Sequence, residues 1–282
     1  MNYRHSYHAG SFTDVFKHVI LTALITSISR KPTPFCYIDT HAGTGYYDLF
    51  SNAAKKTGEY QSGISKVIQK DNPPALVERY LDCVHKMNNK LTASTFSSLQ
   101  YYPGSPMIAK LLLRPHDRII ACELQRDEYQ ALRSAFLGDK QVATHHMDGF
   151  QGLKAFLPPP ERRGLVLIDP PYEDADEFIH LANIMPIALK RWQTGIYAIW
   201  YPVKDRDAIN RFYRILKDNI DSPIYSIELN IYPDLPNHLN GSGVAIINPP
   251  WEFDKSVDSL LPWLWKALTI NDQGSYHATM LK

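Results

Sequence analysis

The sequence has few cysteines, no long apolar run and almost no excess of charge. Its three cysteines, Cys36, Cys83 and Cys122, are odd in number and widely spaced, which predicts reduced thiols and neither a disulfide framework nor a zinc site. No run approaches the roughly 18 apolar residues typical of a membrane span. The first residues also lack the apolar core and cleavage pattern of a signal peptide. We therefore expect a cytoplasmic protein that does not associate with membranes.

The charge balance limits the kinds of partner. A formal net charge of +1 at pH 7 argues mildly against broad, non-specific binding to nucleic acid, but it leaves room for a local patch that serves a structured RNA. Hydrophobic residues make up 44% and charged residues 21% of the chain, which is ordinary for a globular protein and predicts no disordered segment.

Short apolar segments alternate with helical patterns along the 282 residues. The patterns predict strands at 34–39, 117–123, 142–146, 164–168, 196–201, 224–231 and 244–247. They predict helices at 13–28, 60–91 with a break at 71–74, 104–113, 127–136, 176–192, 205–218 and 256–268, and the end of a helix at 153–157. Such alternation is typical of an α/β protein with a mostly parallel, doubly wound sheet, here of seven strands, whose ligands bind at the carboxyl ends of the strands.

The most informative stretch, Asp169-Pro170-Pro171-Tyr172, directly follows the strand at 164–168. Proline fixes φ and disfavours helix at the residue before it, so Asp169 is held in an extended turn. Its carboxylate and the backbone carbonyl at the Asp-Pro step can face one NH2 group, while Tyr172 covers a flat ring. The corner therefore favours a heterocycle that bears an amino group, although two prolines also mark an ordinary strand exit.

Three earlier strand ends carry weaker signals for a nucleoside cofactor. Gly43 and Gly45 follow the first strand and half match a dinucleotide fingerprint. Glu123 ends the next strand, where a carboxylate would accept hydrogen bonds from ribose hydroxyls. Asp148 ends the third strand, where its carboxylate would face an adenine amino group. Either carboxylate could instead be an ordinary cap or turn residue. The spacing from the glycines to Glu123 far exceeds the usual value of about 20 residues, so we infer an insertion of roughly 50 residues.

This order of strand ends resembles the class I S-adenosylmethionine-dependent methyltransferases, and the corner at 169–172 resembles their amino-group motif. Asn248-Pro249-Pro250-Trp251 also fits the permissive form of that motif. It comes last in the chain, however, whereas Asp169 is the fourth strand end after the glycine loop. Asp169 is therefore the preferred catalytic residue.

A wider resemblance covers nearly the whole chain. The segments 3–10, 14–18, 39–45, 101–106, 148–150 and 195–202 look like the bacterial 23S ribosomal RNA adenine-N6 methyltransferase J family. The chain departs from the family at Ser11-Phe12-Thr13, where a more polar triplet is usual, and at Thr44, where Ala is common. Neither change removes a residue with a named role.

The resemblance implies a monomeric, Rossmann-like enzyme that methylates the N6 amino group of one adenine in 23S rRNA with S-adenosyl-L-methionine. The RNA would be naked or part of an assembly intermediate of the large ribosomal subunit. The resemblance also implies the site residues. Cofactor contacts are expected at His18, His41, Ser105, Glu123, Asp148 and Gly149, to which we add Lys17, Gly43 and Gly45. Asp169 is expected to be catalytic, together with Pro170 and Tyr172, and Tyr3, Arg4 and His5 are expected to meet the RNA. No third ligand lies at a suitable spacing from His18 and His41, so no metal is expected.

The expected division has three parts: an arm, helix and first strand with the glycine loop at 1–47, an inserted helical subdomain at 48–100, and the remainder of the methyltransferase domain at 101–282. Alternative functions stay open. A DNA adenine or protein glutamine methyltransferase would use the same corner, although glutamine enzymes usually present Asn at its first position. A catalytically silent RNA-binding or assembly module could also keep the fold.

Overall fold

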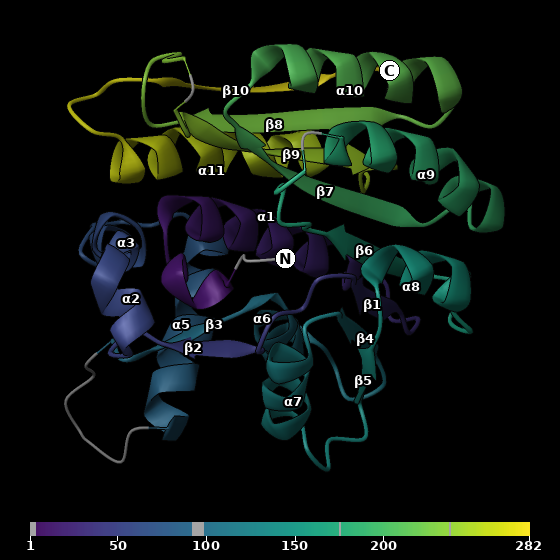
Figure 1. The fold of residues 1–282 in the computed structure, drawn as a ribbon, viewed down its shortest axis with the longest axis horizontal. Helices are drawn as coiled ribbons and strands as arrows, with labels where there is room; N and C mark the ends of the chain where they lie inside the picture. Colours follow the sequence, from purple (N-terminus) through teal and green to yellow (C-terminus); the bar gives the residue numbers. More distant parts are fainter. Residues whose placement is uncertain (1–3, 92–98, 175, 237) are drawn as a thin grey trace.

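The computed structural model describes residues 4–91, 99–174, 176–236 and 238–282. An eight-stranded sheet forms the centre of the fold, in the order β10-β8-β9-β7-β6-β1-β4-β5 (Figure 1). Its strands are β1 (Cys36–Asp39), β4 (Arg118–Glu123), β5 (Val142–His146), β6 (Gly164–Ile168), β7 (Ile196–Val203), β8 (Ile224–Asn230), β9 (Gly241–Ile247) and β10 (Ser275–Met280). The pairs that β1, β4, β5, β6 and β7 form with one another are parallel, and the pairs that involve β8, β9 and β10 are antiparallel. The prediction of a mostly parallel α/β sheet is confirmed.

The predicted number of strands, seven, is one too low. The extra strand, β10, pairs antiparallel with β8 at the edge of the sheet, from Ser275 opposite Asn230 to Met280 opposite Tyr225. Its side chains are mostly exposed, so its sequence lacks the apolar run by which the other strands are recognised. An edge strand that faces water on one side need not be apolar.

Helices cover both faces of the sheet. The principal ones are α1 (Phe12–Ile28), α6 (Ser105–Leu112), α7 (Arg126–Ala135), α8 (Gly149–Phe156), α9 (Glu177–Arg191), α10 (Arg206–Asn219) and α11 (Phe253–Leu268). Side chains of α1, α6, α7 and α11 enter the core on one face, and those of α8, α9 and α10 enter the core on the other. Strand β1 serves both cores, because Tyr37 belongs to the first and its neighbours Cys36 and Ile38 to the second. Within the described ranges, no helix is both long and apolar enough to cross a membrane.

The elements between β1 and α6 lie mostly at the left of Figure 1. This segment contains β2 (Tyr46–Asp48), α2 (Asn52–Thr57), α3 (Glu59–Ser62), α4 (Ile64–Ile68), α5 (Ala75–Leu91) and β3 (Tyr101–Pro103). Strands β2 and β3 pair antiparallel at the base of this segment. They were not predicted, because three residues are too few to establish an alternating pattern. The division of the chain at 47 and 100 stays a prediction.

Helix α1 is buried along most of its length, including Lys17 and His18. It packs against β6 and β9 on one side and against α5, α6 and α11 on others. His18 points away from the apolar stripe, as its position on the helical wheel predicts. It is nevertheless buried, because α5 and α6 also pack against α1, and its Nδ1 lies 2.8 Å from the Tyr102 hydroxyl of β3. Ser11 caps the helix by accepting a hydrogen bond from the Asp14 amide.

Candidate active site

A cavity of about 560 Å³ lies where the parallel strands end. It is lined by most of the residues expected at the site: His5, Lys17, His18, His41, Gly43, Ser105, Glu123, Asp148, Gly149, Asp169, Pro170 and Tyr172. Gly45 and Arg4 do not line it, although Gly45 belongs to the same turn as Gly43 and has a positive φ of 88°. Tyr3 lies outside the described residues. The structure thus brings segments from four strand ends and from α1 into one cavity.

The glycine turn is tied to the end of β4. Glu123 accepts a hydrogen bond from the Gly43 amide at 2.9 Å through Oε2 and one from the Gln125 amide at 2.7 Å through Oε1. Burial raises the pKa of the Glu123 carboxyl, while these backbone donors favour its charged form. Gly43 has a φ of 58°, and a Cβ there would lie 2.0 Å from the Tyr47 hydroxyl. The turn therefore requires glycine and places a carboxylate beside a backbone cradle.

The end of β5 meets the loop after β1. Asp148 caps α8 by accepting a hydrogen bond from the Gln151 amide at 2.9 Å, so the capping role considered from sequence is present in the structure. A Cβ on Gly149 would lie 2.2 Å from the Thr40 carbonyl oxygen, so the helix start and the loop approach closely. Burial lowers the pKa of His41 to about 4, and its imidazole is therefore neutral at pH 7. His41, Asp148 and Gly149 therefore line the cavity side by side with Phe150, whose ring contacts His41.

The Asp169 corner is held by a buried lysine from α1. Lys17 Nζ lies 2.5 Å from Asp169 Oδ2 and 3.0 Å from Asp14 Oδ1. Burial is the largest influence on the pKa of Lys17 and lowers it, but the two carboxylates together outweigh burial and raise the pKa. Asp14 also lies 2.9 Å from His5 Nε2. Lys17, expected at the cofactor, thus contacts the Asp169 corner itself and links it, through Asp14, to the N-terminal arm.

Tyr172 is fixed by three contacts. Its backbone has a positive φ of 51°, its hydroxyl donates to the Trp200 carbonyl oxygen at 2.6 Å, and its ring centroid lies 4.7 Å from that of Phe178. The Trp200 ring lies edge-on to it at 5.8 Å. The ring therefore keeps one orientation at the cavity wall.

Among the residues that sequence reasoning missed are Trp200, which lines the cavity, Asp14, which contacts Lys17, and Asp39, which ends β1. Asp39 is buried, and its Oδ2 accepts a hydrogen bond from the Tyr37 hydroxyl at 2.7 Å. Burial raises its pKa to about 6. Asp39 ends β1 as Glu123 ends β4, and that shared position at a strand end was the available signal. Trp200 lies inside a strand and Asp14 in the first turn of a helix, positions that carry no chemical signal in a sequence.

The second Pro-Pro corner lies at the other end of the sheet. Strand β9 is antiparallel to β7 and ends at Ile247, opposite Tyr197 near the start of β7. The Asn248 amide donates to the Gln193 and Gly195 carbonyl oxygens, both at 2.8 Å. Asn248 therefore closes a turn, and strand direction separates it from the cavity that holds Asp169.

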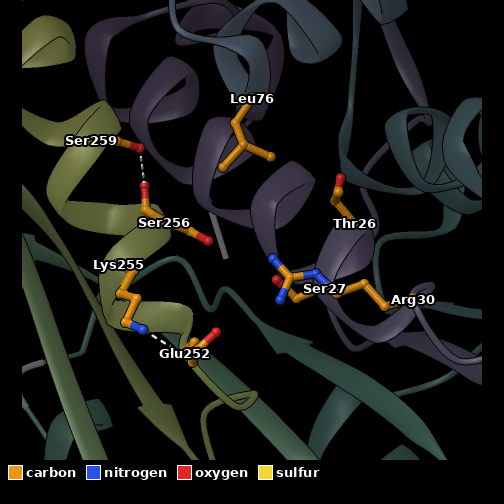
Figure 2. A pocket seen from close by; sticks show the side chains of 8 residues that line it. All are labelled: Thr26, Ser27, Arg30, Leu76, Glu252, Lys255, Ser256 and Ser259. Atoms are coloured by element: carbon orange, nitrogen blue, oxygen red, sulfur yellow. Dashed lines mark hydrogen bonds and ion pairs between the residues drawn. The ribbon is translucent and has the colours of Figure 1, made fainter.

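A smaller pocket of about 330 Å³ lies at this opposite end, between the last turn of α1, the start of α5 and the first turns of α11. Figure 2 shows its lining residues Thr26, Ser27, Arg30, Leu76, Glu252, Lys255, Ser256 and Ser259. Its Lys255 is already paired with Glu252. None of the predicted site residues lines it, so the larger cavity is the candidate active site.

The chain is similar to known proteins over nearly its whole length. Residues 32–281 match the family model described as ribosomal RNA large subunit methyltransferase D, RlmJ. The chain is 43% identical over 281 residues to ribosomal RNA large subunit methyltransferase J of Escherichia coli (strain K12), which covers 99% of this chain and 98% of that protein. It is 41% identical to the protein of the same name from Haemophilus influenzae, over 98% of this chain and 97% of that one. The crystal structure of protein LPL1258 from Legionella pneumophila has a TM-score of 0.85 to this chain at 35% identity and covers 97% of both chains.

Proposed function

The chain belongs to the RlmJ family of ribosomal RNA large subunit methyltransferases, and on that premise we propose that it methylates the N6 amino group of one adenine in 23S rRNA. S-adenosyl-L-methionine would be the methyl donor. The relatives' names supply the class of reaction and the ribosomal RNA. The choice of an amino group rests on one observation, the Asp169-Pro170-Pro171-Tyr172 corner at the wall of the cavity. The protein would bind this RNA either as naked RNA or within an assembly intermediate of the large ribosomal subunit.

The residues around the glycine turn fit the proposed cofactor. Gly43 and Gly149 stand where a Cβ would collide with Tyr47 and Thr40, so backbone alone can line the cavity there. Glu123 holds two backbone donors and still has lone pairs for ribose hydroxyls. Asp148 and the neutral His41 would supply further polar contacts. When bound, S-adenosyl-L-methionine would supply an electrophilic methyl group.

Asp169 would then prepare the target amino group. The lone pair of an adenine N6 is delocalised into the ring, so the site must localise it as the nitrogen becomes tetrahedral. Lys17 engages Asp169 Oδ2, which leaves Oδ1 and the carbonyl at the Asp-Pro step to accept the two amino hydrogens. After methylation the nitrogen is cationic, and Asp169 is the nearest acceptor for its proton.

Tyr172 would stack on the adenine. An adenine inside a helix cannot reach the cavity, so the base must be unpaired or flipped out, and such bases are held by aromatic stacking. The hydrogen bond to the Trp200 carbonyl holds the ring before the base arrives, so little ordering would be needed at that moment.

Two measurements test the proposal. Modified adenines in 23S rRNA should be mapped by mass spectrometry from cells with and without the protein, and the proposal requires one N6-methyladenosine that disappears. Asp169→Ala should reduce methyl transfer to this rRNA by at least about 100-fold, because it removes the acceptor on which the amino group depends. Near-normal methylation by that variant would contradict the role of Asp169. Transfer of labelled methyl groups to DNA or protein in preference to rRNA would contradict the substrate.

A further inference from the structure

We propose that helix α2 and the end of the N-terminal arm form a contact surface for the RNA backbone that flanks the target adenine. The surface consists of Tyr7, Phe50, Lys55 and Lys56, and we call it the α2 surface. This inference rests on the proposed function, because it presupposes that an RNA base enters the cavity. It gives the inserted helices a role in substrate binding.

Each lysine of the α2 surface lies over an aromatic ring. Lys55 Nζ is 5.6 Å from the centroid of the Phe50 ring, and Lys56 Nζ is 5.9 Å from that of Tyr7. Both lysines are exposed, and the Phe50 side chain is 45% exposed. Neighbouring cations and aromatic rings are the groups with which proteins bind single-stranded nucleic acid, since the cations meet phosphates and the rings meet bases.

The α2 surface adjoins the cavity through the arm. Helix α2 packs against the short 3-10 helix at His5–Tyr7, and the Thr57 hydroxyl donates to the Tyr7 carbonyl oxygen. A second contact lies beside this one. His8 Nδ1, directly after the 3-10 helix, lies 2.9 Å from Oε1 of Glu59, the first residue of α3, and both residues line the cavity. An RNA strand that delivers a base to Asp169 therefore passes close to the α2 surface.

The cationic charge of the α2 surface is not neutralised by a carboxylate among the described residues. Exposed Lys255 and Lys266 pair with Glu252 and Asp272, whereas Lys55 and Lys56 contact rings and, in the part of the chain that the structure describes, form no ion pair with a carboxylate. The α2 helix dipole favours lysine in its last turn, but it does not account for a ring beneath each one. Phosphate groups complement both the charge and its position.

The test compares two double variants with equal charge. Lys55→Ala/Lys56→Ala removes the α2 cations, and Lys70→Ala/Lys86→Ala removes two exposed lysines of the same insertion that do not line the cavity. We expect the first variant alone to weaken binding of a 23S rRNA fragment by about tenfold near 0.1 M salt and to reduce the slope of log K against log salt by roughly 1.4. The KM for RNA should rise while kcat and the Kd for S-adenosyl-L-methionine stay unchanged.

The outcomes separate this inference from the proposed function. Equal RNA affinity and salt slope in the two double variants would overturn the α2 surface, even if the wild-type protein methylates the RNA normally. If the wild-type protein binds no rRNA fragment, the proposed function itself fails. Should the alanine variant unfold at a lower temperature, Lys55→Gln/Lys56→Gln replaces it, because glutamine keeps part of the stem over each ring and removes the charge.

Discussion

Lys17 Nζ lies 2.5 Å from Asp169 Oδ2, so an apolar helix near the N-terminus holds the carboxylate at the end of β6. The same ammonium contacts Asp14, which in turn contacts His5 of the arm. A continuous row of charged side chains therefore connects the arm to the Pro-Pro corner. Replacing any one of them is expected to change the pKa values and the positions of its neighbours in this row.

Replacement of Lys17 by methionine should destabilise the protein. Lys17→Met leaves Asp14 and Asp169 close together without their cation, and loss of one partner of a buried ion pair typically lowers the free energy of unfolding by about 3 kcal/mol or more. Urea unfolding of the cofactor-free protein at neutral pH measures this. Lys204→Met is the control, since Lys204 lines the same cavity but is exposed, and it should change stability by less than about 0.5 kcal/mol. Equal stability of the two variants would contradict the prediction.

The ring and the hydroxyl of Tyr172 should have separable roles. Tyr172→Phe loses only the hydrogen bond to the Trp200 carbonyl and should lower stability by about 1 kcal/mol and kcat/KM for RNA by only a few fold. Tyr172→Ala removes the stacking surface and should lower kcat/KM by at least about tenfold, since stacking on one base is worth about 1–3 kcal/mol. Steady-state kinetics with an rRNA fragment tests both. A Phe variant as defective as the Ala variant would show that the hydroxyl matters and the ring does not.

Gly149 should be intolerant of a methyl group. The Cβ of Gly149→Ala would lie 2.2 Å from the Thr40 carbonyl oxygen, so the start of α8 must move away from the β1 loop. We expect a loss of about 1–3 kcal/mol in stability and a weaker affinity for S-adenosyl-L-methionine, measured by calorimetry. Gly138→Ala is the matched control: Gly138 has a φ of 80° but no atom within 4 Å of the added Cβ. Gly138→Ala should lower the stability only because alanine disfavours a positive φ, and it should leave the affinity for the cofactor unchanged.

Asp39 should make stability depend on pH in a defined direction. Its pKa is raised by burial from 3.8 to about 6, so between these values the folded protein holds a proton that the unfolded chain releases. Its contribution to stability is therefore greatest at low pH and declines as the pH rises through this window. Asp39→Asn removes this titration. The stability of the variant relative to the wild type should increase from about pH 4 to about pH 6.5 and then level off. Urea unfolding at several pH values measures the difference, and a constant difference would rule out the shift.

Asn248 should matter for folding and not for chemistry. Asn248→Asp replaces an amide donor with a carboxylate that faces the Gln193 and Gly195 carbonyl oxygens, so two hydrogen bonds become repulsive contacts. Stability should fall by about 1–3 kcal/mol, while kcat of the folded enzyme stays near the wild-type value. Thermal unfolding and methyl transfer, measured on the same preparation, decide this. A large loss of kcat without a loss of stability would instead indicate that the corner at Asn248 takes part in catalysis.

Much of the fold could be read from the sequence because its patterns are local. The apolar run at 164–168 and the helical period at 205–218 match β6 and α10 to within one residue. β2, β3 and β10 could not be predicted, since their residues become strands only when a partner elsewhere in the chain supplies hydrogen bonds.

The candidate site also has a part that the sequence predicts and a part that depends on how distant segments pack. Glu123, Asp148 and Asp169 could be grouped in advance, because the carboxyl ends of parallel strands meet at one edge of a sheet. The contact of Lys17 with Asp169 and the position of Trp200 beside Tyr172 depend on how α1 and β7 pack, and no spacing in the sequence encodes either.

Helix α1 has no side that faces water. Its His18 contacts Tyr102 of β3, and Leu21 and Ile25, one and two turns further on the same side, are also buried. Most of its buried side chains are apolar, although Asp14, Lys17 and His18 are not, and such a helix is stable only when it is enclosed. Helix α5 packs against α1. Removal of residues 48–100 would therefore expose apolar side chains of α1, and we expect the protein to aggregate. Residues 48–100 therefore help to enclose the helix that carries Lys17, and we expect a protein without them to fold poorly.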